Sequence, residues 1–209
     1  MIAIIDYGVG NLFSLKSSLN SLGIANIVTK DENEIAKADK IILPGVGAFK
    51  DAIKSLRDFG LDKVVINEAK KGKPILGICL GMQLLFERSF EYGEHTGLGL
   101  IKGDIAPIAD EVDSSYKIPH IGWNGLHFTK KSPIFKYLKE GDCVYFVHSF
   151  YGKNCEESVI ATTEYGAHLT AAVGSGNIFG CQFHPEKSGN VGLSILKAFD
   201  EYKVSEDLL

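Results

Sequence analysis

The stretch KPILGICLGMQLLF, residues 73–86, changes from a strand-like to a helix-like pattern within a few positions. Residues 74–78 form a short apolar run typical of a buried strand, whereas residues 80–86 mix apolar positions as the start of a packed helix does. Between them stands Gly77-Ile78-Cys79-Leu80-Gly81, a G-x-C-x-G pattern. This pattern predicts a sharp strand-to-helix turn that lifts Cys79 out of the sheet.

Cys79 is a candidate nucleophile because of where such a turn holds it. The flanking glycines remove side chains that would collide, and free backbone N–H groups lie at the start of the helix. Those N–H groups and the helix dipole favour an anion, which lowers the pKa of a thiol and stabilises an oxyanion. A free cysteine can equally be a small buried hydrophobe, so thiol chemistry requires a base elsewhere in the chain.

The stretch FGCQFHPE, residues 179–186, supplies a candidate base. Side chains at positions i and i+2 of an extended chain point to the same side, so His184 and Glu186 share a face. The imidazole would take the thiol proton, and the carboxylate would orient the imidazole. A lone strand histidine is more often a core or surface residue, but an H-P-E sequence in a chain that also has G-x-C-x-G favours a catalytic role.

A second glycine-rich turn, Pro44-Gly45-Val46-Gly47, follows another predicted strand. Ligands of open α/β sheets gather at the carboxyl edge, where this loop and Cys79 would meet. Glycines let backbone N–H groups approach a substrate closely, although a tight turn chosen only for geometry explains the loop equally well. No G-K-[ST] follows it, which argues against a phosphate-binding loop.

The composition suits one soluble globular domain over residues 1–209, with 45% hydrophobic residues and a formal net charge of −4. This mildly acidic balance gives no reason to expect nucleic acid or a membrane surface as a partner. The four cysteines show no C-x-x-C spacing and no metal-ligand cluster, which favours a reducing cytosol. The apolar start breaks at Asp6, too early for a signal peptide or membrane span, so a cytoplasmic location is expected.

Short strands and helices alternate in the first half of the chain. The pattern predicts strands at residues 2–6, 24–29 and 40–43 and helices at 11–22, 31–37, 48–59 and 61–71. The second half is mainly strand-like, at residues 98–101, 118–128, 143–150, 159–165, 170–173 and 178–183, with a helical turn at 133–138 and a last helix at 189–202. The prediction is an α/β fold with a mixed, largely parallel central sheet flanked by helices and an antiparallel extension.

The joint pattern of G-x-C-x-G-x-Q, a distant H-P-E and an upstream P-G-x-G resembles the class I (triad) glutamine amidotransferases over nearly the whole chain. The stretches IDYGVGNLFSL, LPGVGAF, GLGLI, PHIGWN, YFVHSFY and GCQFHPEKSG narrow the resemblance to one branch of that family. Its members are the glutaminase subunits of imidazole glycerol phosphate synthase, in histidine biosynthesis. The resemblance implies a class I amidotransferase fold.

The resemblance also implies roles for individual residues. Cys79 would be the nucleophile, His184 the general base and acid, and Glu186 its orienting carboxylate. The N–H of Leu80, with a backbone N–H of the Gly45-Val46-Gly47 loop, would form the oxyanion hole.

The same resemblance places the substrate, L-glutamine. Gln83 and Glu91 would hold its α-amino and α-carboxylate ends, and the backbone around His148, Ser149 and Phe150 would line the pocket. Gln83 could also be an ordinary helix-surface residue, Glu91 a solvated acid at a helix end, and His148 merely structural. The stretch FEYGEHTGLG carries Tyr92 and His95 where relatives vary, so the role of Glu91 depends on its offset from Cys79.

The implied reaction hydrolyses glutamine to glutamate and ammonia through a thioester. The ammonia would pass to a partner cyclase with a (β/α)₈ barrel, in a heterodimer that makes imidazole glycerol phosphate and an aminoimidazole carboxamide ribotide. Asn11, Trp123, Tyr145 and Lys187 stand in motifs that face that partner. No cofactor and no metal is expected.

Three other functions fit parts of the pattern. One is a cysteine peptidase or esterase-like hydrolase on a similar sheet, in which Gln83 would lose its meaning. Another is a catalytically idle scaffold subunit, against which the intact Cys79, His184 and Glu186 argue. The third is a paralogous subunit that supplies ammonia to a different synthase, such as a surface-sugar amidation enzyme.

Overall fold

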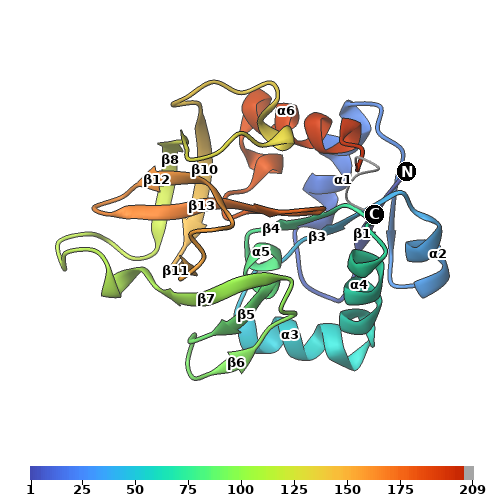
Figure 1. Ribbon diagram of the computed structural model, residues 1–209, viewed down its shortest axis with the longest axis horizontal. Coiled ribbons are helices and arrows are strands. Elements are labelled where there is room, and N and C mark those ends of the chain that lie inside the picture. Colours follow the sequence, from blue (N-terminus) through green and yellow to red (C-terminus); the bar gives the residue numbers. More distant parts are fainter. Residues whose placement is uncertain (205–209) are drawn as a thin grey trace.

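The computed structural model describes residues 1–204 as a central sheet with helices on both faces (Figure 1). The last five residues of the predicted 1–209 domain lie outside the described part. The central sheet has eight strands, in the spatial order β2 (Asn26–Thr29), β1 (Ile2–Ile5), β3 (Lys40–Leu43), β4 (Ile75–Ile78), β14 (Ile178–Cys181), β13 (His168–Ser175), β12 (Val159–Glu164) and β9 (His127–Phe128).

The pairing directions confirm the predicted largely parallel sheet with an antiparallel extension. The strands from β2 to β14 pair in parallel, and β13, β12 and β9 continue the sheet antiparallel. Because β4 and β14 are parallel neighbours with Ile78 opposite Cys181, their carboxyl ends meet at one edge. The residues that follow them, Cys79 and His184, are therefore brought together although they are far apart in the sequence.

Two smaller sheets lie beside the central one. β8 (His120–Gly125) pairs with β10 (Cys143–His148), and the other sheet runs in the order β11 (Phe150–Lys153), β7 (Ile101–Pro107), β5 (Phe86–Ser89) and β6 (His95–Thr96). The predicted strands 118–128 and 143–150 are thus each divided between two sheets, at Leu126 and at Ser149.

Helices cover both faces of the central sheet. α1 (Leu12–Ser21) and α6 (Gly189–Glu201) lie on one face, and α2 (Glu32–Lys37), α3 (Phe49–Asp58), α4 (Leu61–Lys70) and α5 (Leu80–Leu84) on the other (Figure 1). Short 3₁₀ turns lie at Ile108–Asp110, Pro133–Phe135 and Pro185–Lys187. Side chains cap the first two helices: Asn11 accepts a hydrogen bond from the N–H of Ser14, and Asp31 from that of Glu34.

The core has two halves because side chains of a strand alternate between the faces. In β1, Ile2 and Ile4 pack with α1 and α6, and Ala3 and Ile5 pack with the helices of the other face. Within residues 1–204, no helix is long and apolar enough to cross a membrane. All four cysteines, which lie in that range, are free thiols.

The prediction was wrong between residues 80 and 101. The helix after Cys79 ends at Leu84, and the chain continues as β5, which was not predicted. The strand predicted at 98–101 starts only at Ile101, as β7, and before it the N–H groups of Leu98 and Leu100 donate to the carbonyls of Leu84 and Leu85. Gly99 there has a φ of 65°, a left-handed conformation that does not fit a strand.

Candidate active site

Cys79 lies at the turn between β4 and α5 in a backbone conformation that side chains rarely adopt, with φ 55° and ψ −113°. The turn is so tight that a Cβ atom on Gly77 would lie 2.7 Å from the Met82 backbone. A Cβ atom on Gly81 would lie 1.8 Å from the carbonyl oxygen of Leu43. Neither glycine of the G-x-C-x-G pattern leaves room for a side chain. The predicted strand-to-helix turn is present.

The backbone on both sides of Cys79 holds this strained residue in place. Its N–H donates to the carbonyl of Cys181 at 2.7 Å, and its own carbonyl accepts from the N–H of Gln83 at 3.2 Å. Strained residues persist only where the surrounding structure fixes them, and such residues cluster at functional sites. Cys79 is only 7% exposed, and it lines a cavity.

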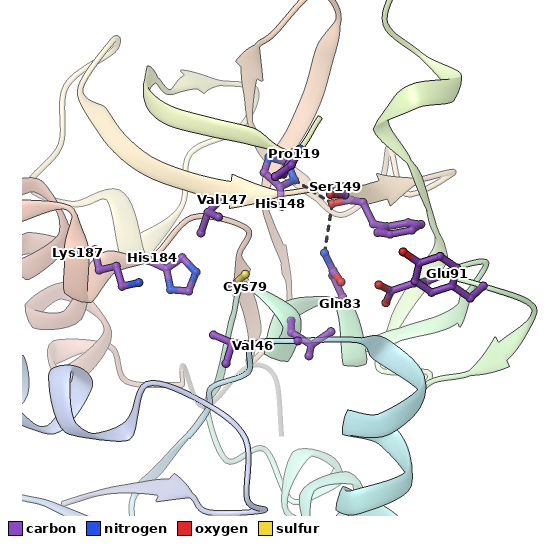
Figure 2. A pocket seen from close by; sticks show the side chains of 14 residues that line it. Val46, Cys79, Gln83, Glu91, Pro119, Val147, His148, Ser149, His184 and Lys187 are labelled. Carbon is purple, nitrogen blue, oxygen red and sulfur yellow. Dashed lines mark hydrogen bonds between the residues drawn. The ribbon is translucent and has the colours of Figure 1, made fainter. Parts of the chain in front are cut away.

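His184 and Glu186 form a buried pair, with Nδ1 of His184 2.8 Å from Oε1 of Glu186. Their side chains are only 2% and 3% exposed. Because a carboxylate can only accept, it keeps a hydrogen on Nδ1, so Nε2 is the atom at which the ring gains or loses a proton. This Nε2 atom is buried without a hydrogen-bond partner in residues 1–204, and in Figure 2 the ring faces Cys79.

The charge environment of His184 suits a proton carrier. Burial alone lowers the pKa of the imidazole, but the adjacent Cys79 sulfur and the Glu186 carboxylate outweigh it and raise the pKa to about 9. The backbone of His184 is held by a bond from its N–H to the carbonyl of Tyr145 at 3.0 Å and one from the Ser188 hydroxyl to its carbonyl at 2.6 Å.

A cavity of about 420 Å³ opens over the Cys79 thiol. Cys79 lies between His184 on one side and Gln83 on the other (Figure 2). The structure brings most of the predicted site residues to this cavity: Val46, Gly47, Cys79, Leu80, Gln83, Glu91, His148, Ser149, Phe150, His184 and Lys187. Tyr92 also lines it and is 87% exposed, so it stands at the rim.

The loop after β3 packs against the start of α5. A Cβ atom on Gly45 would lie 2.8 Å from the backbone nitrogen of Gly81 and 2.7 Å from the Tyr7 hydroxyl. That hydroxyl donates to the carbonyl of Pro44 at 2.6 Å, and burial, followed by the charge of Cys79, raises the pKa of Tyr7, which therefore stays a neutral donor. The loop backbone thus adjoins the N–H groups at the start of α5, where an oxyanion would be stabilised.

Gln83 is buried rather than on a helix surface, which excludes the ordinary interpretation of this residue. Its amide nitrogen donates to the carbonyl of Phe150 at 3.2 Å and to the side-chain oxygen of Gln182 at 3.0 Å. Gln182 in turn places its amide nitrogen 3.8 Å from the Cys79 sulfur. Gln182 was not predicted as a site residue, although it stands two residues before His184.

Glu91 is 9% exposed, so it is not a solvated acid at a helix end. Its Oε2 accepts a hydrogen bond of 2.6 Å from the N–H of Phe49, the first residue of α3. Burial raises the pKa of Glu91 despite that bond. The carboxylate therefore stabilises the N-terminus of α3 and presents itself to the cavity at the same time.

His148 is a neutral, structural member of the cavity wall. Its Nδ1 lies 2.9 Å from the carbonyl of Phe150 and its Nε2 3.0 Å from Nδ1 of His120. Burial lowers the pKa of His148 to about 3, so the ring carries no charge at neutral pH. His120, fully buried, was not singled out from the sequence because a strand histidine has no distinguishing pattern.

The comparisons with known proteins agree with this geometry. The family model for glutamine amidotransferase class-I matches residues 3–200. The chain belongs to the class-I glutamine amidotransferase family. The cysteine peptidase and esterase-like alternatives are therefore not supported.

Several relatives of this amidotransferase match nearly its whole length. It is 53% identical to the imidazole glycerol phosphate synthase subunit HisH of Oceanobacillus iheyensis, covering 96% of this chain and 98% of the relative. It is 49% identical to the subunit of the same name from Lactococcus lactis subsp. lactis, over 96% and 98% of the two chains. A crystal structure described as a glutamine amidotransferase superposes with a TM-score of 0.74 at 20% identity, over 95% of this chain and 99% of that one, which supports the fold.

Of the four residues predicted to face a partner of this amidotransferase, Lys187 lines the cavity itself. Trp123 is 55% exposed and meets Tyr145 edge to face at 6.0 Å, and the Lys187 ammonium lies 5.9 Å from the centre of the Tyr145 ring. Asn11 lines a narrow crevice shared with His184 and Glu186. Residues 1–204 contain no cluster of three or more acidic, cysteine or histidine side chains that could hold a metal.

Proposed function

We propose that this chain is the glutaminase subunit of an imidazole glycerol phosphate synthase. It hydrolyses L-glutamine to glutamate and ammonia through a cysteinyl thioester and delivers the ammonia to a cyclase subunit in histidine biosynthesis. The observation that carries the proposal is Cys79 at its strained turn, beside the buried His184–Glu186 pair. About half of the residues are identical to those of relatives that bear this name over nearly their full length.

The first half of the reaction forms the thioester. The Cys79 sulfur attacks the side-chain amide carbon of glutamine, and the amide oxygen becomes an oxyanion. The N–H of Leu80 and an N–H of the Gly45-Val46-Gly47 loop would stabilise that oxyanion. His184, protonated on Nε2, gives its proton to the leaving nitrogen as the C–N bond breaks, and ammonia departs.

The second half cleaves the thioester. His184, now neutral, takes a proton from water while the water oxygen attacks the thioester carbon. A second oxyanion forms in the same position and collapses as the C–S bond breaks. The electron pair returns to sulfur, glutamate leaves, and the thiolate–imidazolium pair is restored. Glu186 stabilises the imidazolium in each half through the 2.8 Å contact with Nδ1.

Glutamine would bind with its α-amino end towards Gln83 and Glu91. Both hydrogen bonds of the Gln83 side chain use its nitrogen, which leaves Oε1 to accept from an ammonium group. The Glu91 carboxylate at 9% exposure adds the opposite charge. The backbone at His148, Ser149 and Phe150, which also line the cavity, would receive the α-carboxylate.

The partner would be a (β/α)₈-barrel cyclase in a heterodimer, bound over Asn11, Trp123, Tyr145 and Lys187. Exposed apolar side chains on the same elements support an interface there: Phe13 is 82% exposed and Ile121 57%. Such a complex would work in the cytoplasm. Residues 1–209 would form a single domain, without a cofactor.

The test is glutamate release by the purified chain mixed with a cyclase of this class and its nucleotide ligand. Cys79→Ala should abolish glutamate release, while cyclase turnover with added ammonium salts should persist, because the substitution removes only the nucleophile. Continued glutamate release by Cys79→Ala would refute the mechanism. Stimulation by a surface-sugar synthase instead of the cyclase would favour the paralogue, and no stimulated release at all would favour the scaffold.

A further inference from the structure

Gln182 is a buried side chain that touches the nucleophile and takes no part in the steps above. It is 0% exposed and lies directly after β14. Its Nε2 is 3.8 Å from the sulfur of Cys79, within hydrogen-bond range for sulfur, and its Oε1 is 3.0 Å from Nε2 of Gln83. A fully buried amide needs partners at both ends, and here one of the partners is the reacting atom.

The direction of these hydrogen bonds follows from one backbone carbonyl. The carbonyl oxygen of Phe150 can only accept, so the Gln83 amide must turn its nitrogen towards it. That same nitrogen lies next to Gln182, which must therefore present its oxygen to Gln83. The nitrogen of Gln182 is then left facing the Cys79 sulfur, as an N–H donor.

We propose that Gln182 is a further catalytic residue, whose N–H stabilises negative charge on the Cys79 sulfur. This inference rests on the proposed glutaminase function. A thiolate accepts a hydrogen bond better than a thioester sulfur does, because the thioester has lost the charge. The bond therefore weakens when the thioester forms and strengthens again when water cleaves it.

The stabilisation acts mainly in the second half of the reaction. As the C–S bond breaks, the electron pair moves onto sulfur, and the Gln182 N–H is already in place to receive that charge. An interaction that strengthens towards the transition state raises kcat rather than substrate affinity. Gln83 keeps its bond to the Phe150 carbonyl without Gln182, so glutamine binding should change little.

The first test is Gln182→Met, a substitution of similar length that removes the N–H donor. With the cyclase and its ligand bound, we expect kcat for glutamate release to fall about tenfold with KM within about twofold of the wild type. In the isolated chain, alkylation of Cys79 by iodoacetamide at pH 7 should slow by about threefold to tenfold. Cys143, an exposed thiol of the same chain, gives the reference alkylation rate in each sample.

A second variant, Gln182→Glu, keeps the shape of the side chain and tests the same hydrogen bond if the Met variant fails to fold. Its carboxyl group would donate to sulfur when protonated and repel the thiolate when ionised. The alkylation rate of Cys79 relative to the wild type should therefore fall as the pH rises from about 6 to about 9. A purely structural role of Gln182 would not produce this dependence.

Thr163→Val is the matched control. Thr163 is also 0% exposed and donates one partly buried hydrogen bond, to the Gly125 carbonyl at 3.0 Å, but it lies on β12 and does not line the cavity. It should leave Cys79 alkylation and kcat unchanged even if the melting temperature falls.

Wild-type kcat and alkylation rates in both Gln182 variants would overturn the inference. So would an equal slowing in Thr163→Val, which would trace the effect to lost stability. Failure of the proposed function is a separate result, since wild-type chain that releases no glutamate with the cyclase would refute it directly. The alkylation series on the isolated chain would still test the hydrogen bond to sulfur.

Discussion

The Nδ1 atom of His184 lies 2.8 Å from the Oε1 atom of Glu186, two residues further along the chain, and both side chains are almost completely buried. The intervening Pro185 begins a 3₁₀ turn, which brings the carboxylate back to the ring. An ion pair at this depth is strengthened by the low local dielectric, so its two members should act as one unit with Cys79.

Replacing the two members of this pair should have unequal effects. Glu186→Gln keeps a hydrogen-bond partner but removes the charge, and we expect kcat to fall by roughly 10²-fold. His184→Asn removes the proton carrier and should lower kcat by at least about 10⁴-fold. Steady-state glutamate release with the cyclase present measures both. Adding Cys79→Ala to His184→Asn should cost little more, and strictly multiplicative losses would contradict a shared mechanism.

The raised pKa of His184 predicts an alkaline limit for the reaction. Because the folded-state pKa is about 9, the imidazole keeps its Nε2 proton at neutral pH and loses it as the pH rises through about 9. Above that pH no acid is available to protonate the leaving nitrogen, so kcat/KM should fall. Removing the Glu186 charge destabilises the imidazolium, so in Glu186→Gln the fall should begin at lower pH.

The measurements are kcat/KM between pH 6 and 10 and the ¹⁵N chemical shifts of His184 over the same range. His148, with a pKa of about 3, stays neutral throughout this pH range and does not contribute to the alkaline fall in kcat/KM. An alkaline limit that is the same in the wild type and in Glu186→Gln would show that His184 is not the titrating group.

Gly81 allows a test of whether the turn requires glycine because there is no space for a side chain. Gly81 has no left-handed φ, but a Cβ atom there would lie 1.8 Å from the Leu43 carbonyl oxygen. Gly81→Ala should therefore lower the free energy of unfolding by about 3 kcal/mol or more, measured by chemical denaturation. Gly23 has a φ of 71° with nothing near its Cβ position, so Gly23→Ala should cost only about 1 kcal/mol. Equal costs would mean that space at Gly81 is not the cause.

These elements also show what the sequence could and could not predict. The turn at Cys79, the caps of α1 and α2, and the pair of His184 with Glu186 depend on local spacing, and the structure contains each of them. The strand β5 was missed because α5 is only one turn long, and residues 80–86 look helical when read without their neighbours.

Contacts between segments far apart in the sequence could not be predicted from local sequence patterns. Gln182 meets Cys79 only because β14 pairs with β4, and Glu91 accepts from the N–H of Phe49, a residue far from it in the sequence. His120 and His148 meet only through the pairing of β8 with β10. These residues lie in or beside recognisable motifs, but their hydrogen-bond partners depend on which strands pair in the sheets.

We expect the Pro44–Gly47 loop to control the site. One half of this loop is fixed: Tyr7 donates to the Pro44 carbonyl, and Gly45 has no space for a side chain against α5. The other half is free, because Val46 is 41% exposed and nothing lies within 4 Å of the Cβ position of Gly47. A peptide unit there can rotate and turn an N–H towards or away from the oxyanion.

Because ammonia released without an acceptor wastes glutamine, we expect the isolated chain to be nearly idle. An oxyanion donor that faces away removes roughly 3–4 kcal/mol of transition-state stabilisation, so the cyclase with its nucleotide ligand should raise the glutaminase rate by about 10²–10³-fold. Gly47 has a φ of 99°, which alanine disfavours, so Gly47→Ala should change the ratio of stimulated to basal rate more than the KM for glutamine. Gly141→Ala, with a φ of 84° and equal space, is the control that should leave this ratio unchanged. The rates are measured as glutamate release at saturating glutamine, with and without the cyclase and its ligand, and full activity of the isolated chain would refute the idea.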